Sequence, residues 1–200
     1  MENNSFILDN FSPNTTWFSM KTLSAFGFFC LSRFSKPVAN RKIYRLIRDN
    51  KVSSIIEFGL GDGTRTEKMI QTAKRFMLGD TVRYTGIDLF EGRPEGESPL
   101  SLREMHRRLN KSEIKSQLVP GDSQSAVMRI ANSHLRTDLI LITAQYSLES
   151  FDQCWYFFPR MLHAQSVVMI QSEAEGAFHS MSRLDIEKLG EKSKKARAAA

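Results

Sequence analysis

Cysteine is scarce in this chain of 200 residues, which contains only Cys30 and Cys154. Two cysteines cannot form a framework of disulfides, and they are too few for a zinc site built from thiolates. No apolar run reaches the roughly 18 residues that a membrane-spanning helix needs. The 11 glycines and 6 prolines are too few for a collagen or a low-complexity fibre. The length suits one globular domain, with or without an appendage.

Positive charge is only mildly in excess: the chain has 28 Lys and Arg residues and 22 Asp and Glu residues, which gives a net charge of +6. Such an excess is compatible with contact to nucleic acid or anionic lipid but demands neither. Basic side chains gather on two predicted helices, at 41–48 and 103–111. These segments lack the interleaved aromatic side chains of a single-strand binder, so solvated helix faces are the simpler interpretation.

The chain divides into three zones. Residues 1–36 form an N-terminal extension that we expect to be partly helical, residues 37–190 form a cofactor-binding domain, and residues 191–200 form a basic tail that we expect to be disordered. The apolar segment 23–31 is as short as the core of a signal peptide, but the polar leader before it and the missing cleavage site argue against secretion. An amphipathic helix on the domain or on a membrane surface is favoured, and we predict a cytoplasmic protein.

Helix and strand patterns alternate along residues 37–171. Short apolar runs predict strands, and apolar side chains at helical spacing predict helices. The predicted strands are 53–58, 81–88, 117–120, 138–143 and 166–170, with a sixth small one at 177–179; the predicted helices are 37–49, 64–77, one beginning at Ser98 and Pro99, 123–134, 148–163 and a last short one after Ser182. This order predicts an α/β fold with a doubly wound, mostly parallel, Rossmann-like sheet of five or six strands, with helices on both faces. The sheet is expected to be shortened at its C-terminal end.

A glycine-rich loop, Glu57-Phe58-Gly59-Leu60-Gly61-Asp62-Gly63, follows the first predicted strand and precedes a helix. Glycine at every second position lets a ligand lie on the backbone. A dinucleotide-binding loop would have its third glycine one position later, at Thr64. The loop instead resembles the first motif of class I S-adenosylmethionine-dependent methyltransferases. The resemblance implies that S-adenosylmethionine binds here, with Glu57, Gly59, Gly61 and Gly63 among its contacts.

Polar residues follow the other strands, where ligands of such sheets bind. Asp88 ends the second strand, at the place where a carboxylate accepts hydrogen bonds from ribose hydroxyls. Asp122 follows the third strand, where the methyltransferase resemblance implies contact with the adenine amino group. Asp122 is also well placed to cap the next helix, and this alternative stays open. Ser123 and Thr143, which follow strands three and four, complete the predicted cofactor-binding residues.

The end of strand four, Thr143-Ala144-Gln145-Tyr146, carries neither a carboxylate nor a histidine. Many small-molecule methyltransferases have an acidic residue there, which supplies a metal ligand or a base. We therefore predict no metal site and assign no catalytic residue. The loop 90–98 is expected to border the acceptor pocket.

The resemblance covers residues 37–171 and implies a methyltransferase with an unidentified acceptor. A small-molecule acceptor is favoured over nucleic acid, for which no motif is present, and association of identical subunits is left open. A non-catalytic protein that binds S-adenosylmethionine or a partner is the first alternative, favoured by the short sheet. A nicotinamide-dependent oxidoreductase is less well supported, because the third glycine comes early and no Tyr-x-x-x-Lys occurs.

Overall fold

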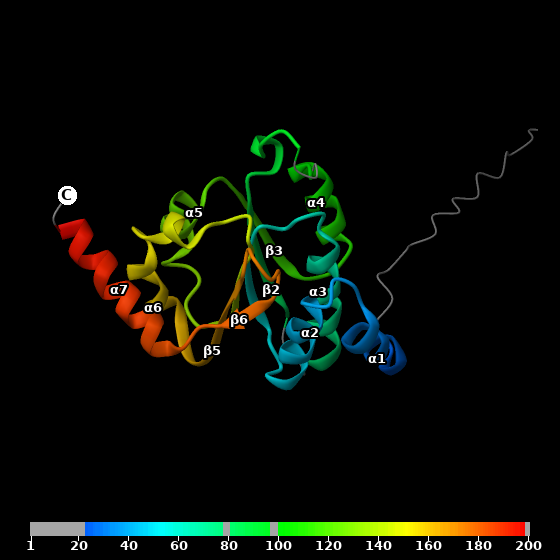
Figure 1. The fold of residues 1–200 in the computed structure, drawn as a ribbon. Helices are drawn as coiled ribbons and strands as arrows, with labels where there is room; N and C mark the ends of the chain where they lie inside the picture. The colour runs from blue at the N-terminus through cyan, green and yellow to red at the C-terminus, as the bar shows by residue number, and fades with distance from the viewer. Residues whose placement is uncertain (1–22, 78–80, 97–99, 199–200) are drawn as a thin grey trace, which may run out of the picture.

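One six-stranded sheet forms the centre of the molecule. The computed structural model describes residues 23–77, 81–96 and 100–198 (Figure 1). The strand order is β3-β2-β1-β4-β5-β6, and every neighbouring pair is parallel except β5 and β6. The strands are β1 (Ser54–Phe58), β2 (Arg83–Asp88), β3 (Lys115–Pro120), β4 (Thr137–Ile142), β5 (Leu162–Gln171) and β6 (Phe178–Ser180).

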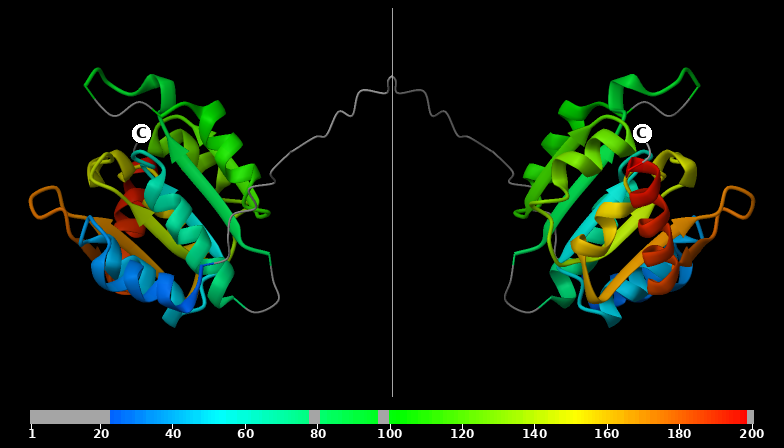
Figure 2. Two further views of the ribbon diagram at one scale, coloured as in Figure 1. Left: turned by 90° about the vertical axis from the view of Figure 1, so that its right-hand side faces the viewer. Right: turned by 90° about the vertical axis from the view of Figure 1, so that its left-hand side faces the viewer.

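Helices cover both faces of this sheet (Figure 2). One face carries α1 (Ala25–Phe34), α2 (Asn40–Asp49), α3 (Thr64–Phe76) and α4 (Leu102–Asn110). The other carries α5 (Ser123–Ile130), the 3-10 turns η2 (Leu148–Phe151) and η3 (Trp155–Phe157), α6 (Phe158–Met161) and α7 (Arg183–Ala198). A further 3-10 turn, η1 (Phe90–Gly92), follows β2. No helix among the described residues is long and apolar enough to cross a bilayer.

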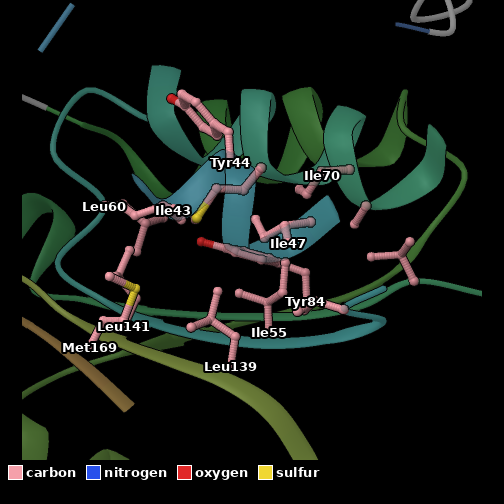
Figure 3. Packing of buried hydrophobic residues seen from close by; sticks show 14 of the residues in the cluster. Ile43, Tyr44, Ile47, Ile55, Leu60, Ile70, Tyr84, Leu139, Leu141 and Met169 are labelled. Carbon is pink, nitrogen blue, oxygen red and sulfur yellow. The ribbon is translucent and has the colours of Figure 1, made fainter. Parts of the chain in front are cut away.

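Each face of the sheet has its own apolar core. Alternate residues of a strand point to opposite faces, so Ile55 and Ile56 of β1 enter different clusters. Ile55 lies in the same cluster as Ile43 and Ile47 of α2, and Figure 3 shows it facing Ile47. Ile56 belongs to the cluster that contains Trp155 on the opposite side. The two-sided burial explains why the central strands β1 and β4 consist mostly of apolar residues, and it confirms the predicted doubly wound, mostly parallel sheet.

The winding direction changes between β1 and β4. The connections through α3 and α4 lie on one face, and α5 lies on the other. β1 pairs with both β2 and β4, so the carboxyl ends of these three strands are neighbours. Such a switch point is where open α/β sheets bind ligands.

The prediction of one continuous helix at 148–163 is wrong. The segment forms η2, η3 and the four-residue helix α6, and residues 162–163 already belong to β5. Pro159 stands in the first turn of α6, where its missing N–H removes no helical hydrogen bond. A continuous helix would have placed this proline in its interior.

The basic tail is not disordered in the part that the structure describes, which corrects the sequence-based prediction. α7 continues to Ala198. Gly190 faces Pro159 and the Trp155 carbonyl oxygen, so α7 packs on α6 and η3, and Ser193 is buried. The Lys- and Ala-rich composition that indicated fraying is also favourable to a helix once one face is packed. The predicted helix start at Ser98 and Pro99 lies outside the described residues.

Candidate functional site

The glycine loop joins the end of β1 to the start of α3, at the carboxyl edge of the sheet. Gly59, Gly61 and Gly63 have φ of 82°, 61° and 80°. A Cβ atom at Gly59 would lie 2.0 Å from Thr143 Oγ1, so no other residue fits there. A Cβ atom at Gly61 would meet no described atom within 4 Å. The loop is therefore closed against β4 at Gly59 and open to a ligand at Gly61.

Glu57 lies beneath this loop and is fully buried. Its Oε1 accepts a hydrogen bond from Arg65 Nε at 2.7 Å, and its Oε2 accepts from Thr66 Oγ1 and from the Tyr84 hydroxyl, both at 2.6 Å. Arg65 also donates to the Gly59 carbonyl at 2.6 Å. Burial, and then the neighbouring Glu57 charge, raise the pKa of Tyr84 well above its ordinary value. This network joins β1, β2 and α3, and it gives Glu57 a supporting role beneath the loop.

Asp88 is fully buried at the end of β2, beside the glycine loop. Its Oδ2 accepts from the Leu60 amide at 2.7 Å, and its Oδ1 accepts from the Phe90 amide at 2.9 Å. Burial alone would raise the pKa of Asp88, but the hydrogen bonds from Arg93, Leu60 and Phe90 outweigh it and hold the pKa below the ordinary value. Asp88 is therefore an ionised carboxylate that joins β2 to the loop after β1.

Arg93 takes up the remaining acceptor positions of Asp88. Its Nε donates to Oδ1 at 2.7 Å and its NH2 donates to Oδ2 at 2.6 Å. The same NH2 donates to the Gly61 carbonyl at 2.8 Å, and the Arg93 side chain is only 5% exposed. The guanidinium thus spans from Asp88 to the open part of the glycine loop. A ribose can use Asp88 only after Arg93 has moved.

Asp122 and Ser123 begin α5 after β3. Asp122 is the N-cap of α5, since its Oδ1 accepts from the Ser125 amide at 2.9 Å and its Oδ2 accepts from the Ser125 hydroxyl at 2.8 Å. These two hydrogen bonds lower the pKa of Asp122. The Ser123 hydroxyl is buried and donates to the Ser150 carbonyl at 2.9 Å. The capping role of Asp122 is confirmed, its contact with adenine stays a prediction, and the Ser123 hydroxyl is directed to η2.

Thr143 follows β4 and is buried against Gly59. Its amide donates to the Phe58 carbonyl at 3.0 Å, which extends the pairing of β1 and β4 by one residue. The backbone after β3 is joined to β2 in the same way, because the Gly121 amide donates to the Asp88 carbonyl at 3.0 Å. The structure therefore brings the predicted residues of four strand ends to one edge of the sheet.

The loop after β2 borders an open pocket of about 220 Å³, lined by Phe90, Glu91, Arg93, Pro94, Glu95, Gly96, Leu100 and Ser101. The pocket lies beside the Asp88–Arg93 pair, since Arg93 contributes to both. Residues 97–98 of the predicted acceptor loop lie outside the described residues. No group of three metal-ligating side chains occurs in the part of the chain that the structure describes.

Two arginines of the site were not predicted from the sequence. Arg65 and Arg93 carry no motif that distinguishes them from the other basic residues of this chain. Arg65 stands two residues after Gly63, and Arg93 stands five after Asp88. The one sequence signal for the Arg65–Glu57 and Arg93–Asp88 ion pairs is that a basic residue follows a candidate carboxylate within a few positions along the chain.

Comparison with known proteins bears on the fold. No protein-family model and no curated protein matches the sequence. Among solved structures, the chain is similar to the O-methyltransferase TomG from Streptomyces achromogenes, which was solved in complex with SAM; the TM-score is 0.51 at 10% identity, over 83% of this chain and 70% of that chain. It is also similar to cofactor-bound Rv0187 from MTB, with a TM-score of 0.50 at 12% identity, over 84% and 74% of the two chains. The chain therefore has the Rossmann-like fold found in class I methyltransferases.

Proposed function

We propose that this protein is an S-adenosylmethionine-dependent methyltransferase that acts on a small-molecule acceptor without a metal ion. The observation that carries the proposal is the buried Asp88 carboxylate at the end of β2, hydrogen-bonded to Leu60 of the glycine loop. The fold supports the same conclusion, because its solved neighbours include a methyltransferase in complex with SAM. The absence of a carboxylate after β4 favours chemistry without a metal.

The residues present fit this cofactor once Arg93 is displaced. Asp88 would accept the ribose hydroxyls, and the open backbone at Gly61 would receive the amino-acid end. Asp122 would lie at the adenine end, where its carboxylate is exposed. Thr143 would support the loop through Gly59. When bound, the cofactor supplies a methyl group already activated by a sulfonium.

The contribution of the protein is then chiefly to hold the acceptor in line with that methyl group. Positioning of two reactants can supply about 7–11 kcal/mol of a barrier, so no general base is required. Tyr146 is an unsuitable base, because its hydroxyl donates to the Gly121 carbonyl at 3.1 Å and its ring packs edge-on against Phe58. The exposed Glu173 and Glu175 lie after β5 and remain candidates for contact with a cationic acceptor.

The binding test is calorimetry with S-adenosylhomocysteine, the demethylated product of the cofactor. In a background without the competing guanidinium (Arg93→Met), Asp88→Ala should weaken binding about ten- to 150-fold, because it removes a charge-assisted hydrogen bond of roughly 1.5–3 kcal/mol. Asp88→Asn keeps the size of the side chain and should also weaken binding. The exposed Asp152→Ala provides the matched control and should bind like the wild type. Unchanged affinity in folded Asp88 variants, or no binding by the wild type, would refute the assignment.

A non-catalytic cofactor-binding protein is the second candidate. The closure of Asp88 by Arg93 favours it, because an enzyme that turns over must open this pair in every cycle. Binding of the methyl donor without turnover on a broad panel of acceptors would support this candidate. Preferential binding of a nicotinamide dinucleotide would contradict both. We place the protein in the cytoplasm, which fits its two free cysteines, Cys30 and Cys154.

A further inference from the structure

The outward face of α1 is apolar. Phe26, Phe29 and Phe34 are 74%, 51% and 66% exposed, while Phe28 and Leu31 on the opposite face are buried in the core. A helix that is apolar on both faces is normally buried on both. Four of the nine exposed large apolar side chains of the described residues fall within residues 26–38, including Val38 at 64% exposure. The gathering of these side chains indicates a surface that is covered when the protein works.

This helix is held firmly to the domain. At its beginning, Arg75 of α3 donates to the Leu23 carbonyl at 2.6 Å. At its end, Arg41 of α2 donates to the Ser35 carbonyl at 2.8 Å. Between them, the Arg48 guanidinium lies 5.2 Å from the centre of the Phe28 ring. The apolar face therefore has a fixed orientation, and Figure 1 shows α1 on the outside of α2 and α3, away from the sheet.

The same region carries charge of one sign. Residues 23–48 contain no Asp or Glu. Their basic residues are Arg33, Lys36, Arg41, Lys42, Arg45 and Arg48. Arg33 falls seven residues after Phe26 and four after Phe29, so it shares their helix face. Exposed aromatic rings beside a basic surface are the combination that binds an interface of anionic lipid.

We propose that the outer face of α1, with Phe26, Phe29 and Phe34, docks this protein on an anionic lipid surface. The aromatic rings would enter the boundary between headgroups and acyl chains, and Arg33 and Lys36 would lie at the level of the lipid phosphates. A second copy of the chain fits less well, because symmetric pairing of α1 brings the basic residues of both copies together. The proposal is independent of the proposed methyltransferase function.

The test is co-sedimentation of the full chain with vesicles. Vesicles of phosphatidylcholine and phosphatidylserine at about 7:3 should bind the protein at low salt, and vesicles of phosphatidylcholine alone should bind it much less. Phe26→Ser with Phe29→Ser should weaken binding at least about tenfold, because the variant lacks the two aromatic rings whose transfer from water into the lipid favours binding. Arg33→Gln with Lys36→Gln should weaken it about 30-fold. Leu184→Ser, at a residue that is 59% exposed on α7, is the matched control and should bind like the wild type.

The outcomes separate the possible occupants of this face. Equal binding of the wild type and the Phe26/Phe29 variant to anionic vesicles, with both proteins folded by circular dichroism, would overturn the proposal. A wild-type dimer without vesicle binding, split by the Phe26/Phe29 variant, would assign the face to a second copy. Vesicle binding only after removal of residues 1–22 would assign it to that segment. A monomer that binds no vesicle with or without this segment would point to a protein partner, and each of the last three results overturns docking of the full chain on lipid.

Discussion

Arg93→Met should bind S-adenosylhomocysteine more tightly than the wild type, in contrast to most changes in a binding site. The wild-type guanidinium donates to both Asp88 oxygens, at 2.7 and 2.6 Å, and to the Gly61 carbonyl at 2.8 Å. In the proposed function a ribose would need the same carboxylate oxygens, so cofactor binding to the wild type would include the free energy of breaking this pair. Methionine keeps much of the side-chain volume and removes the charge and the donors.

The magnitude follows from the two hydrogen bonds to Asp88. A hydrogen bond to a charged group contributes roughly 1.5–3 kcal/mol, and the pair is nearly enclosed, with Arg93 5% and Asp88 0% exposed. If one such bond is lost without compensation when the cofactor binds, the variant should bind about ten- to 150-fold more tightly. The free variant should be less stable than the wild type, because it leaves a buried carboxylate with only two backbone donors.

The assay is calorimetry at about pH 8, because the loss of Arg93 removes a contact that lowers the pKa of Asp88 and an alkaline pH favours the ionised carboxylate. Thermal unfolding of the same samples measures the expected loss of stability. Arg103→Met changes an exposed arginine on α4 and serves as the control, with affinity equal to that of the wild type. Equal or weaker binding by folded Arg93→Met would refute the reasoning, because it would mean that Arg93 assists the ligand instead of competing with it.

Two further changes test the architecture around the site. Gly59→Ala should lower the free energy of unfolding by at least about 1–3 kcal/mol, because its Cβ would lie 2.0 Å from Thr143 Oγ1 at a φ of 82°. Adding Thr143→Ala should recover part of this loss, and a denaturant titration measures both variants. Asp138 tests the pH dependence of stability: burial would raise its pKa, but hydrogen bonds from Ser53 and His163 hold the pKa below the ordinary value. This stabilisation is therefore present above the unfolded pKa of about 3.9 and is lost as the pH falls through the lower folded pKa. Asp138→Asn should be less stable than the wild type by about 1–2 kcal/mol at neutral pH and should approach it in acid, whereas a constant difference between pH 7 and pH 3 would contradict the pKa shift.

The secondary structure was predictable wherever one local pattern decided it. The apolar runs at 53–58 and 138–143 correspond to β1 and β4 within one or two residues. The segment 148–163 was not predictable in this way, because its apolar spacing suits a helix while Pro159 and the packing of Phe151 and Trp155 break it into short turns. The helical tail also depended on packing, since Gly190 contacts Pro159 across the chain.

Outside 148–163 and the C-terminal tail, the sequence by itself determined the order of strands and helices, and with it the edge of the sheet at which open α/β sheets bind ligands. Periodicity of apolar residues and the spacing of Gly59, Gly61 and Gly63 are local properties, so they can be read without coordinates. Only the tertiary structure decided how Asp88 is used, because the approach of Arg93 depends on the loop after β2, where Phe90 has a φ of 49° and turns the chain back. Hydrogen bonds between side chains that meet through such a turn leave no periodic trace in the sequence. The carboxylate that the sequence presents as open to a ribose is therefore closed by an arginine in the folded protein.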